Sequence, residues 1–286
     1  MATVKQYLSL VKFSHTIFAL PFAMIGFTLG ILERGAGIDG WLLLKVLLCM
    51  VFARSAAMAF NRYADRRFDA QNPRTAVREI PSGVIGANGA LAFTLINALL
   101  FIVTTGFINP LCLALSPVAL AVILGYSLTK RFTALCHLIL GIGLALAPIG
   151  AYLAVTGVFA WMPLMFSFAV LFWVSGFDII YALQDESFDR THHLKSIPVW
   201  LGSKGALRLS EMLHTGSAAC VLMAGWMGNM GIGYWTGCAL FIGLLIYQHR
   251  LVKPNDLSRV DLAFFTANGI ASVVFAASVI LDLCWL

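Results

Sequence analysis

Long apolar runs alternate with short polar connections along the chain, and this pattern sets the predicted elements. The runs cover residues 15–32, 41–60, 90–107, 110–128, 134–156, 162–182, 209–228, 232–249 and 262–285. A helix needs about 20 predominantly apolar residues to cross the hydrocarbon core of a bilayer. Most of these runs reach that length. The pattern therefore predicts an all-α, multi-pass membrane protein with nine transmembrane helices.

The composition agrees with little mass outside the bilayer. The 286 residues are 60% hydrophobic and 11% charged, whereas an ordinary soluble domain carries about 25% charged residues. No linker or low-complexity tract interrupts the apolar pattern, so we expect residues 1–286 to form a single transmembrane domain. The first apolar run is interpreted as a spanning helix, because no cleavage pattern for a signal peptide follows it.

The distribution of basic residues predicts the orientation. If the N-terminus is cytoplasmic, the cytoplasmic connections receive all of the 19 Lys and Arg residues except Arg34, Lys45 and Arg54. By the positive-inside rule we expect an inner-membrane protein with a cytoplasmic N-terminus and the C-terminus on the opposite side. The net charge of +6 thus reflects topology and gives no reason to expect a nucleic-acid partner. The long charged connections 61–89 and 183–208 also face the cytoplasm, where we expect the active site.

An internal repeat links two acidic clusters. Asp65 and Asp69 recur as Asp185 and Asp189, 120 residues later, after the second and the sixth predicted span. Four helices separate the copies, and an even number preserves orientation. Each cluster is followed by a basic residue and Ile-Pro, in REIP at 78–81 and KSIP at 195–198. We expect two parallel four-helix repeats plus a ninth helix.

The spacing within each cluster predicts an acidic stripe. At 100° per residue, Asn61, Asp65 and Asp69 fall within an arc of about 80° on a helix. The second cluster falls within a similar arc; its members are Asp178, Tyr181, Asp185 and Asp189. If the second and sixth helices extend past the bilayer, two facing stripes would form a cage of at least four carboxylates.

The chemistry of these side chains favours a magnesium–phosphate site. Carboxylate oxygens suit hard cations such as Mg²⁺, which also binds waters and substrate phosphates. No C-x-x-C pair occurs among the six cysteines, which argues against a metal–thiolate site. Basic residues that could bind phosphate lie nearby: Arg66, Arg74, Arg78, Lys130, Arg190 and Lys195. The alternative is a solvated, ion-paired face, but two clusters at equivalent positions of a repeat favour a site.

Two ionisable residues inside or beside apolar spans strengthen this interpretation. Asp178 follows the apolar run 171–177, and Arg54 lies within the second span, two helical turns before Asn61. Charged groups there are costly and mark functional sites. A substrate with a phosphate head and a long apolar tail would fit such a site. The alternative function is a transporter of cations or anionic metabolites, since transporters also use repeats. The carboxylates gather at one face, however, and the opposite side lacks a matching charged vestibule.

Three motifs together resemble the UbiA superfamily of intramembrane prenyltransferases. They are N-x-x-x-D-x-x-x-D at 61–69, Y-x-x-x-K at 126–130, and D-x-x-Y-x-x-x-D-x-x-x-D at 178–189. The resemblance covers essentially the whole chain. It implies nine helices around a central cavity that opens to the cytoplasm and to lipid. It also implies Mg²⁺-dependent transfer of a polyprenyl chain from polyprenyl diphosphate to an aromatic acceptor. Separately, the sequence gives no sign of an obligate protein partner.

The resemblance also implies roles for individual residues. The metal–diphosphate ligands, and thus the catalytic set, would be Asp65, Asp69, Asp185 and Asp189. The diphosphate clamps would be Arg78 and Lys130, with Arg74 and Lys195 as weaker candidates. The wall near the acceptor would comprise Arg54, Asn61, Asp178 and Tyr181, and Tyr126 would complete the substrate-binding set.

Within the superfamily, this chain resembles the branch of enzymes that act in quinone biosynthesis. The segment NPRTAVREIPSG at 72–83 and the second motif as a whole are similar to this branch, which includes the 4-hydroxybenzoate polyprenyltransferases of ubiquinone synthesis. The second motif and the following KSIPVWLG are similar to menaquinone enzymes of the futalosine route, which act on a dihydroxynaphthoate. One departure is Arg62, where many relatives carry Asp. Arg54 would suit the carboxylate of either acceptor; alternatively, it pairs with Asp178 or a helix carbonyl as a structural element.

Overall fold

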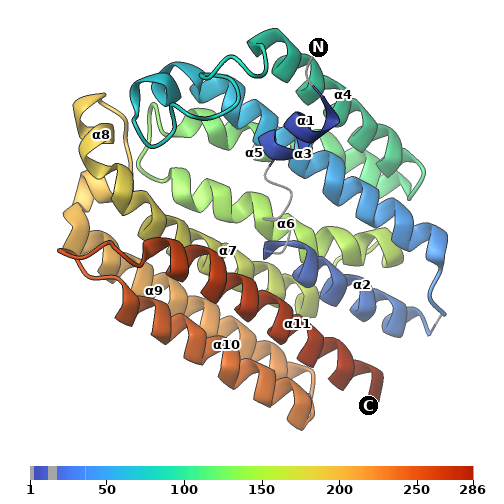
Figure 1. Ribbon diagram of the computed structural model, residues 1–286. Helices are drawn as coiled ribbons and strands as arrows, with labels where there is room; N and C mark the ends of the chain where they lie inside the picture. Colours follow the sequence, from blue (N-terminus) through green and yellow to red (C-terminus); the bar gives the residue numbers. More distant parts are fainter. Residues whose placement is uncertain (1–2, 12–17, 36, 286) are drawn as a thin grey trace. The chain divides into compact units, whose positions relative to one another are not determined.

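The computed structural model describes residues 3–11, 18–35 and 37–285, and its regular secondary structure there is helical (Figure 1). The elements are α1 (Val4–Leu10), α2 (Leu20–Arg34), α3 (Gly40–Gln71), α4 (Ala87–Gly106), α5 (Pro110–Thr129), α6 (Cys136–Thr156), α7 (Trp161–Ala182), η2 (Leu183–Asp185), α8 (Glu186–Thr191), α9 (Ile197–Met227), α10 (Ile232–Leu251), η3 (Leu262–Ala267) and α11 (Asn268–Trp285). The all-α prediction is confirmed.

Six stretches of the described chain are long and apolar enough to cross a membrane. They are Gly40–Gln71, Ala87–Gly106, Pro110–Thr129, Cys136–Thr156, Trp161–Thr191 and Leu262–Trp285. The protein is therefore an integral, multi-pass membrane protein. The remaining apolar runs overlap α2, α9 and α10, and the count of nine transmembrane helices stays a prediction. Residues 15–17, where the first predicted span begins, lie outside the described residues.

The chain divides into two compact units. The small unit comprises Met1–Thr16 and Asp39–Leu128, and the large unit comprises Ile17–Ile38 and Thr129–Leu286. The first acidic motif, at 61–69, belongs to the small unit, and the second, at 178–189, belongs to the large unit. Each motif is therefore described below within its own unit.

In the small unit, the first acidic motif stands on one uninterrupted helix. Asp39 caps α3, because its Oδ1 accepts hydrogen bonds from the amides of Trp41 (2.8 Å) and Leu42 (3.2 Å), which have no carbonyl partner in the first turn. The helix continues to Gln71, about three turns past the end of the apolar run at residue 60. The second predicted helix thus extends past its apolar segment, which is the condition on which the predicted acidic stripe of Asn61, Asp65 and Asp69 depended.

The large unit is organised around the aromatic side chains of α7. Trp173 is fully buried and contacts Phe22 of α2, Phe241 of α10 and Phe177 of its own helix. Its indole Nε1 donates a 2.8 Å hydrogen bond to Asn268 Oδ1, so the one polar atom of the ring has a partner in the apolar interior. This packing makes α7, which carries the start of the second acidic motif, the central helix of the large unit.

Two glycines allow the neighbours of α7 to approach closely. A Cβ on Gly141 of α6 would lie 2.2 Å from Ser175 Oγ and 2.6 Å from the Leu171 carbonyl oxygen, both on α7. A Cβ on Gly176 of α7 would lie 2.3 Å from the imidazole ring of His214 on α9. Small residues at such crossings are typical of membrane helices, whose association depends on close backbone contact.

The second acidic motif differs from the predicted uniform stripe. The α-helix α7 ends at Ala182, residues Leu183–Asp185 form the 3₁₀ turn η2, and α8 begins at Glu186. A 3₁₀ turn rotates about 120° per residue, so the 100° rule does not hold across it. The restart places Glu186 and Asp189 in the first turn of α8, where negative charge is favourable to the helix dipole.

Candidate active site

The polar residues of the first motif lie along one face of α3. Asn61 and Asp65 are one turn apart, and Asn61 Nδ2 donates a 3.2 Å hydrogen bond to Asp65 Oδ2. The same amide lies 3.5 Å from Ser127 Oγ on α5. Asn61 therefore orients the Asp65 carboxylate from within the motif, which agrees with the predicted common face.

The last aspartate of the first motif is paired with a cation. Arg78 Nη1 lies 2.7 Å from Asp69 Oδ1, and the Asp69 carboxylate is buried. Thr75 Oγ1 donates a 3.2 Å hydrogen bond to the Asp69 carbonyl. The connection after α3 thus folds back onto the helix end. It places Arg78, a predicted diphosphate clamp, beside a predicted metal ligand.

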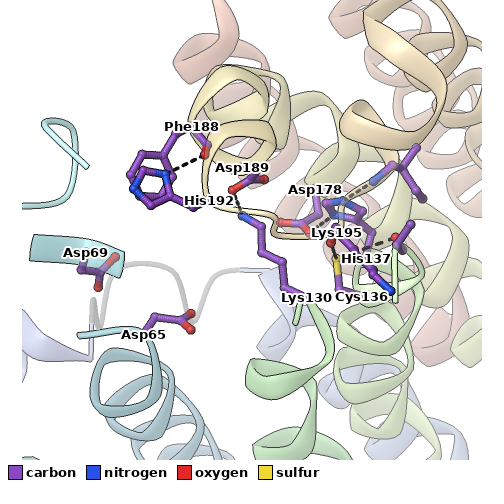
Figure 2. Close-up of polar contacts among 12 residues, drawn as sticks. Asp65, Asp69, Lys130, Cys136, His137, Asp178, Phe188, Asp189, His192 and Lys195 are labelled. Carbon is purple, nitrogen blue, oxygen red and sulfur yellow. Dashed lines mark hydrogen bonds and ion pairs between the residues drawn. The ribbon is translucent and has the colours of Figure 1, made fainter. Parts of the chain in front are cut away.

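The last aspartate of the second motif has an equivalent partner. Lys130 Nζ lies 2.7 Å from Asp189 Oδ1, and the carboxylate of Asp189 is 1% exposed (Figure 2). Burial lowers the pKa of Lys130, but attraction to Asp189 outweighs it, and the net pKa is raised. The ammonium group is therefore charged at any physiological pH, as a diphosphate-binding lysine must be.

Backbone contacts connect Lys130 to the segment after the second motif. The Lys195 amide donates a 2.7 Å hydrogen bond to the Lys130 carbonyl. The side chain of Lys195 turns to the same connection, because its Nζ donates to the Phe132 carbonyl at 3.1 Å. In this structure Lys195 stabilises the position of Lys130, and its own ammonium already has a protein acceptor.

Both buried aspartates keep an oxygen for a cation. Asp69 Oδ2 and Asp189 Oδ2 are buried and have no hydrogen-bond partner of ordinary geometry among the described residues, which is costly unless an ion binds there. Oxygen donors of this kind suit Mg²⁺. Among the described side chains, no group of three or more His, Cys, Asp or Glu could alone hold a metal ion. The residues thus fit an ion that completes its coordination with waters and substrate phosphate.

A histidine that the sequence analysis missed contacts the second motif. His137 Nδ1 on α6 lies 2.7 Å from Asp178 Oδ2 on α7 (Figure 2). The available signal was its position at the start of an apolar span, where an ionisable side chain is costly. The prediction for Asp178 considered Arg54 as a partner, and the large unit supplies His137.

The structure places the other predicted residues as follows. Tyr181 stacks on Phe264 of η3 with ring centroids 4.1 Å apart. Asp185 ends the 3₁₀ turn and is half-buried. Arg54 on α3 and Tyr126 on α5 are also half-buried. Arg74 lies exposed in the connection after α3, and its amide donates a 3.0 Å hydrogen bond to Asn72 Oδ1. Their roles as substrate-binding residues stay predictions.

Arg62, the departure from the usual motif, is buried. Its side chain is 4% exposed and lies close enough to Asp69 and Glu79 for electrostatic attraction. A buried guanidinium needs such anionic neighbours, because an uncompensated buried charge is costly. The small unit therefore contains two cations near Asp69, namely Arg62 and Arg78.

Comparison with known proteins agrees with this geometry. The profile of the UbiA prenyltransferase family matches residues 19–270. A 4-hydroxybenzoate octaprenyltransferase from Tolumonas auensis is 31% identical over 242 residues, which are 84% of each chain. The apo structure of a UbiA homolog from Aeropyrum pernix K1 matches with a TM-score of 0.83 and 32% identity, over 94% of this chain and 98% of that one.

A more distant structure shares the fold. A UbiA homolog from Archaeoglobus fulgidus, solved with DMAPP and Mg²⁺, matches with a TM-score of 0.75 and 22% identity, over 98% of this chain and all of that one (100%). The family profile covers most of the chain, and the motifs on which the resemblance depends lie within it. The protein is therefore a member of the UbiA prenyltransferase family and an integral membrane prenyltransferase.

Proposed function

We propose that this enzyme transfers a polyprenyl chain from polyprenyl diphosphate to a hydroxylated aromatic carboxylate, in ubiquinone or menaquinone biosynthesis. The observation that carries the proposal is the 2.7 Å ion pair between Lys130 and the buried Asp189. It sets a cation that can bind diphosphate beside a carboxylate with one oxygen left for a metal ion. The substrate named for the Tolumonas relative, 4-hydroxybenzoate, is an acceptor of the proposed class.

The proposed metal ligands are Asp65, Asp69, Asp185 and Asp189. When bound, Mg²⁺ neutralises charge on the diphosphate and so makes it a better leaving group. Each motif ends in an aspartate with one oxygen in an ion pair, and its other oxygen makes no hydrogen bond of ordinary geometry within the described part of the chain. That arrangement supports the assignment of Asp69 and Asp189 as ligands whose orientation is fixed before the substrate binds.

The basic residues hold the leaving group during transfer. Arg78 and Lys130 bind diphosphate oxygens, and Arg74 and Lys195 contribute from the surrounding connections. The bond between the allylic carbon and oxygen breaks, and its electron pair leaves with the diphosphate. A ring carbon of the acceptor forms a new bond to the allylic carbon, and the displaced ring hydrogen leaves as a proton. Apolar helices exclude water, which would otherwise capture the allylic cation.

The acceptor is recognised through its hydroxyl and carboxylate groups. Arg54 binds the carboxylate, because a guanidinium matches it with two parallel hydrogen bonds. Asn61, Tyr126, Asp178 and Tyr181 form the wall around the ring. The acceptor class contains both 4-hydroxybenzoate and 1,4-dihydroxy-6-naphthoate, since each carries the two groups that these residues require.

The membrane placement follows the charge pattern. We infer that residues 1–286 form one domain of nine transmembrane helices, arranged as two parallel four-helix repeats plus a ninth helix around a central cavity. The N-terminus and the active site face the cytoplasm, and the protein lies in the inner membrane. The distribution of 19 basic residues, of which only Arg34, Lys45 and Arg54 lie outside the cytoplasmic connections in this topology, supports the orientation.

An acceptor screen tests the function. Purified protein in lipid vesicles receives octaprenyl diphosphate, Mg²⁺ and either 4-hydroxybenzoate or 1,4-dihydroxy-6-naphthoate. Mass spectrometry should show one acceptor whose mass has increased by the prenyl group minus one hydrogen. Vesicles without protein and an Asp185→Asn preparation serve as controls. Correctly folded protein that forms no product with either acceptor would overturn the assignment of an aromatic carboxylate acceptor.

A further inference from the structure

His137 lies in no sequence motif, yet it contacts the second acidic motif inside the large unit. It stands in the first turn of α6, and its Nδ1 is 2.7 Å from Asp178 Oδ2 (Figure 2). The side chain of His137 is 4% exposed, whereas that of Asp178 is 23% exposed. The carboxylate can therefore contact a substrate, and the imidazole lies behind it.

The other ring nitrogen identifies which tautomer this pair contains. His137 Nε2 faces the backbone amide of Ile197 at 3.4 Å, at the start of α9. A backbone N–H is only a donor, so Nε2 must be the acceptor and carries no hydrogen. The hydrogen-bond network is therefore satisfied by a ring whose Nδ1 carries a hydrogen and donates it to Asp178. This contact holds Oδ2 of the carboxylate in a fixed direction, and Oδ1 has no hydrogen-bond partner among the described residues.

The same histidine reaches the segment that positions Lys130. Ile197 lies two residues after Lys195, whose amide donates to the Lys130 carbonyl at 2.7 Å. Cys136, the neighbour of His137, also directs its Sγ to the Lys195 carbonyl at 3.7 Å. The first turn of α6 thus contacts both the residue proposed to face the acceptor and the segment that supports the diphosphate clamp.

The close crossing of α6 and α7 brings the pair together. Gly141 lies one turn after His137 and Ser175 lies one turn before Asp178, and these two residues are at the contact between the helices. Because glycine has no side chain, the helix axes approach closely enough for the imidazole to reach the carboxylate directly. The pair therefore depends on the packing of this crossing.

We propose that His137 is a positioning residue: it fixes the Asp178 carboxylate so that the free oxygen accepts the hydroxyl hydrogen of the aromatic acceptor. This inference rests on the proposed function. Electron density withdrawn from that O–H bond moves toward the ring, which makes the ring a better nucleophile for the allylic carbon. His137 itself touches no substrate, because Asp178 lies between them.

Two substitutions of His137 by amide side chains distinguish the two hydrogen bonds that the imidazole ring makes. In His137→Asn, the amide nitrogen can occupy the place of Nδ1 and still donate to Asp178, but the contact to Ile197 is lost. In His137→Gln, the longer side chain reaches the place of Nε2 and can accept from Ile197, but the donor to Asp178 is lost. The pair of variants therefore distinguishes positioning of the carboxylate from support of the α9 start.

Steady-state kinetics and binding provide the readouts. We expect His137→Gln to lower kcat/KM for the acceptor by about tenfold, the effect of one lost hydrogen bond to a charged group, and to leave the KM for octaprenyl diphosphate unchanged. His137→Asn should recover most of that loss. Equilibrium binding of radiolabelled 4-hydroxybenzoate, or of the naphthoate if that is the acceptor turned over, should weaken in His137→Gln without prenyl donor present.

A double-mutant comparison completes the test. If His137 acts through Asp178, then His137→Gln should add no further loss in kcat/KM to Asp178→Asn. Equal losses in both amide variants, a parallel rise in the KM for both substrates, or additive effects with Asp178→Asn would each overturn the positioning role. Failure of wild-type protein to form product is a separate result: it removes the proposed function, and this assignment with it.

Discussion

Asp69 and Asp189 show how a single ion pair can prepare a carboxylate for a metal. Each is buried against a cation at 2.7 Å, and each retains an oxygen that has no hydrogen bond of ordinary geometry to the described residues. Removing one member of such a pair leaves the other charge uncompensated. The resulting loss of folding stability is larger than the stability that the intact pair contributes. The cations therefore fix the positions of these buried carboxylates before the substrate arrives.

Lys130 offers a direct test at the residue scale. We expect Lys130→Gln to raise the KM for octaprenyl diphosphate by about tenfold or more, because a charged hydrogen bond to the leaving group is lost. The melting temperature in detergent should also fall, since Asp189 loses its partner. Lys45→Gln is the matched control, because within the described residues Lys45 Nζ donates to the exposed Phe107 carbonyl and forms no ion pair. Equal effects of the two substitutions would argue against the role of Lys130.

The proposed metal ligands give a second prediction. Asp65→Asn and Asp185→Asn should each reduce turnover at saturating Mg²⁺ to background, because an amide cannot replace a carboxylate as an anionic ligand. Both variants should remain inserted and keep the wild-type elution volume in size-exclusion chromatography. Turnover of wild-type protein should disappear with EDTA and return with added Mg²⁺. Normal rates in either variant would refute these ligand assignments.

At the scale of helices, the two acidic motifs are built differently. The first stands on the uninterrupted α3, whereas the second passes from α7 through a 3₁₀ turn into α8. Glu186, at the start of α8, accepts hydrogen bonds from Ser203 (2.7 Å) and Arg190 (3.0 Å). These contacts stabilise the short helix at the point where the second motif departs from the backbone geometry of the first.

The crossing of α6 and α7 supplies a prediction at this scale. In Gly141→Ala the new methyl group would lie 2.6 Å from the backbone oxygen of Leu171, so the helices must separate, at a cost of about 1–3 kcal/mol. We expect a lower melting temperature and a lower kcat/KM for the acceptor. Gly150→Ala on the same helix is the control, because nothing lies within 4 Å of its new Cβ. A Gly141→Ala protein as stable and active as Gly150→Ala would contradict the packing argument.

At the scale of the whole molecule, the orientation in the membrane decides where substrates enter. The connection around Gly83 lies among arginines, and the connection around Gly157 contains no Lys or Arg. Alkaline phosphatase fused after Gly157 should be active, since it folds only outside the cytoplasm, and a fusion after Gly83 should be inactive. Fluorescent-protein fusions at the same sites should give the reverse result. Activity after Gly83 would overturn the cytoplasmic assignment of the site.

Much of this description followed from local patterns. Apolar runs marked the helices because backbone groups in lipid must be satisfied within the chain, and i, i+4 spacing placed Asn61, Asp65 and Asp69 on one face. The apolar run ends at residue 60 and α3 continues to Gln71, because hydropathy reports the bilayer boundary and a helix can continue beyond it. The break in the helix at Leu183–Asp185 was not predicted. The spacing rule assumes a continuous α-helix, and the residue types of the motif do not reveal a 3₁₀ turn.

The sequence by itself determined the membrane class, the family motifs and the residue types of the candidate site, because these depend on composition and on short-range spacing. Only the tertiary structure decided which cation pairs with which aspartate, since Lys130 and Asp189 are 59 residues apart in the chain. It also decided that His137 reaches Asp178. That contact needs two helices to cross at a glycine, and close packing between distant segments leaves no periodic signal in the chain.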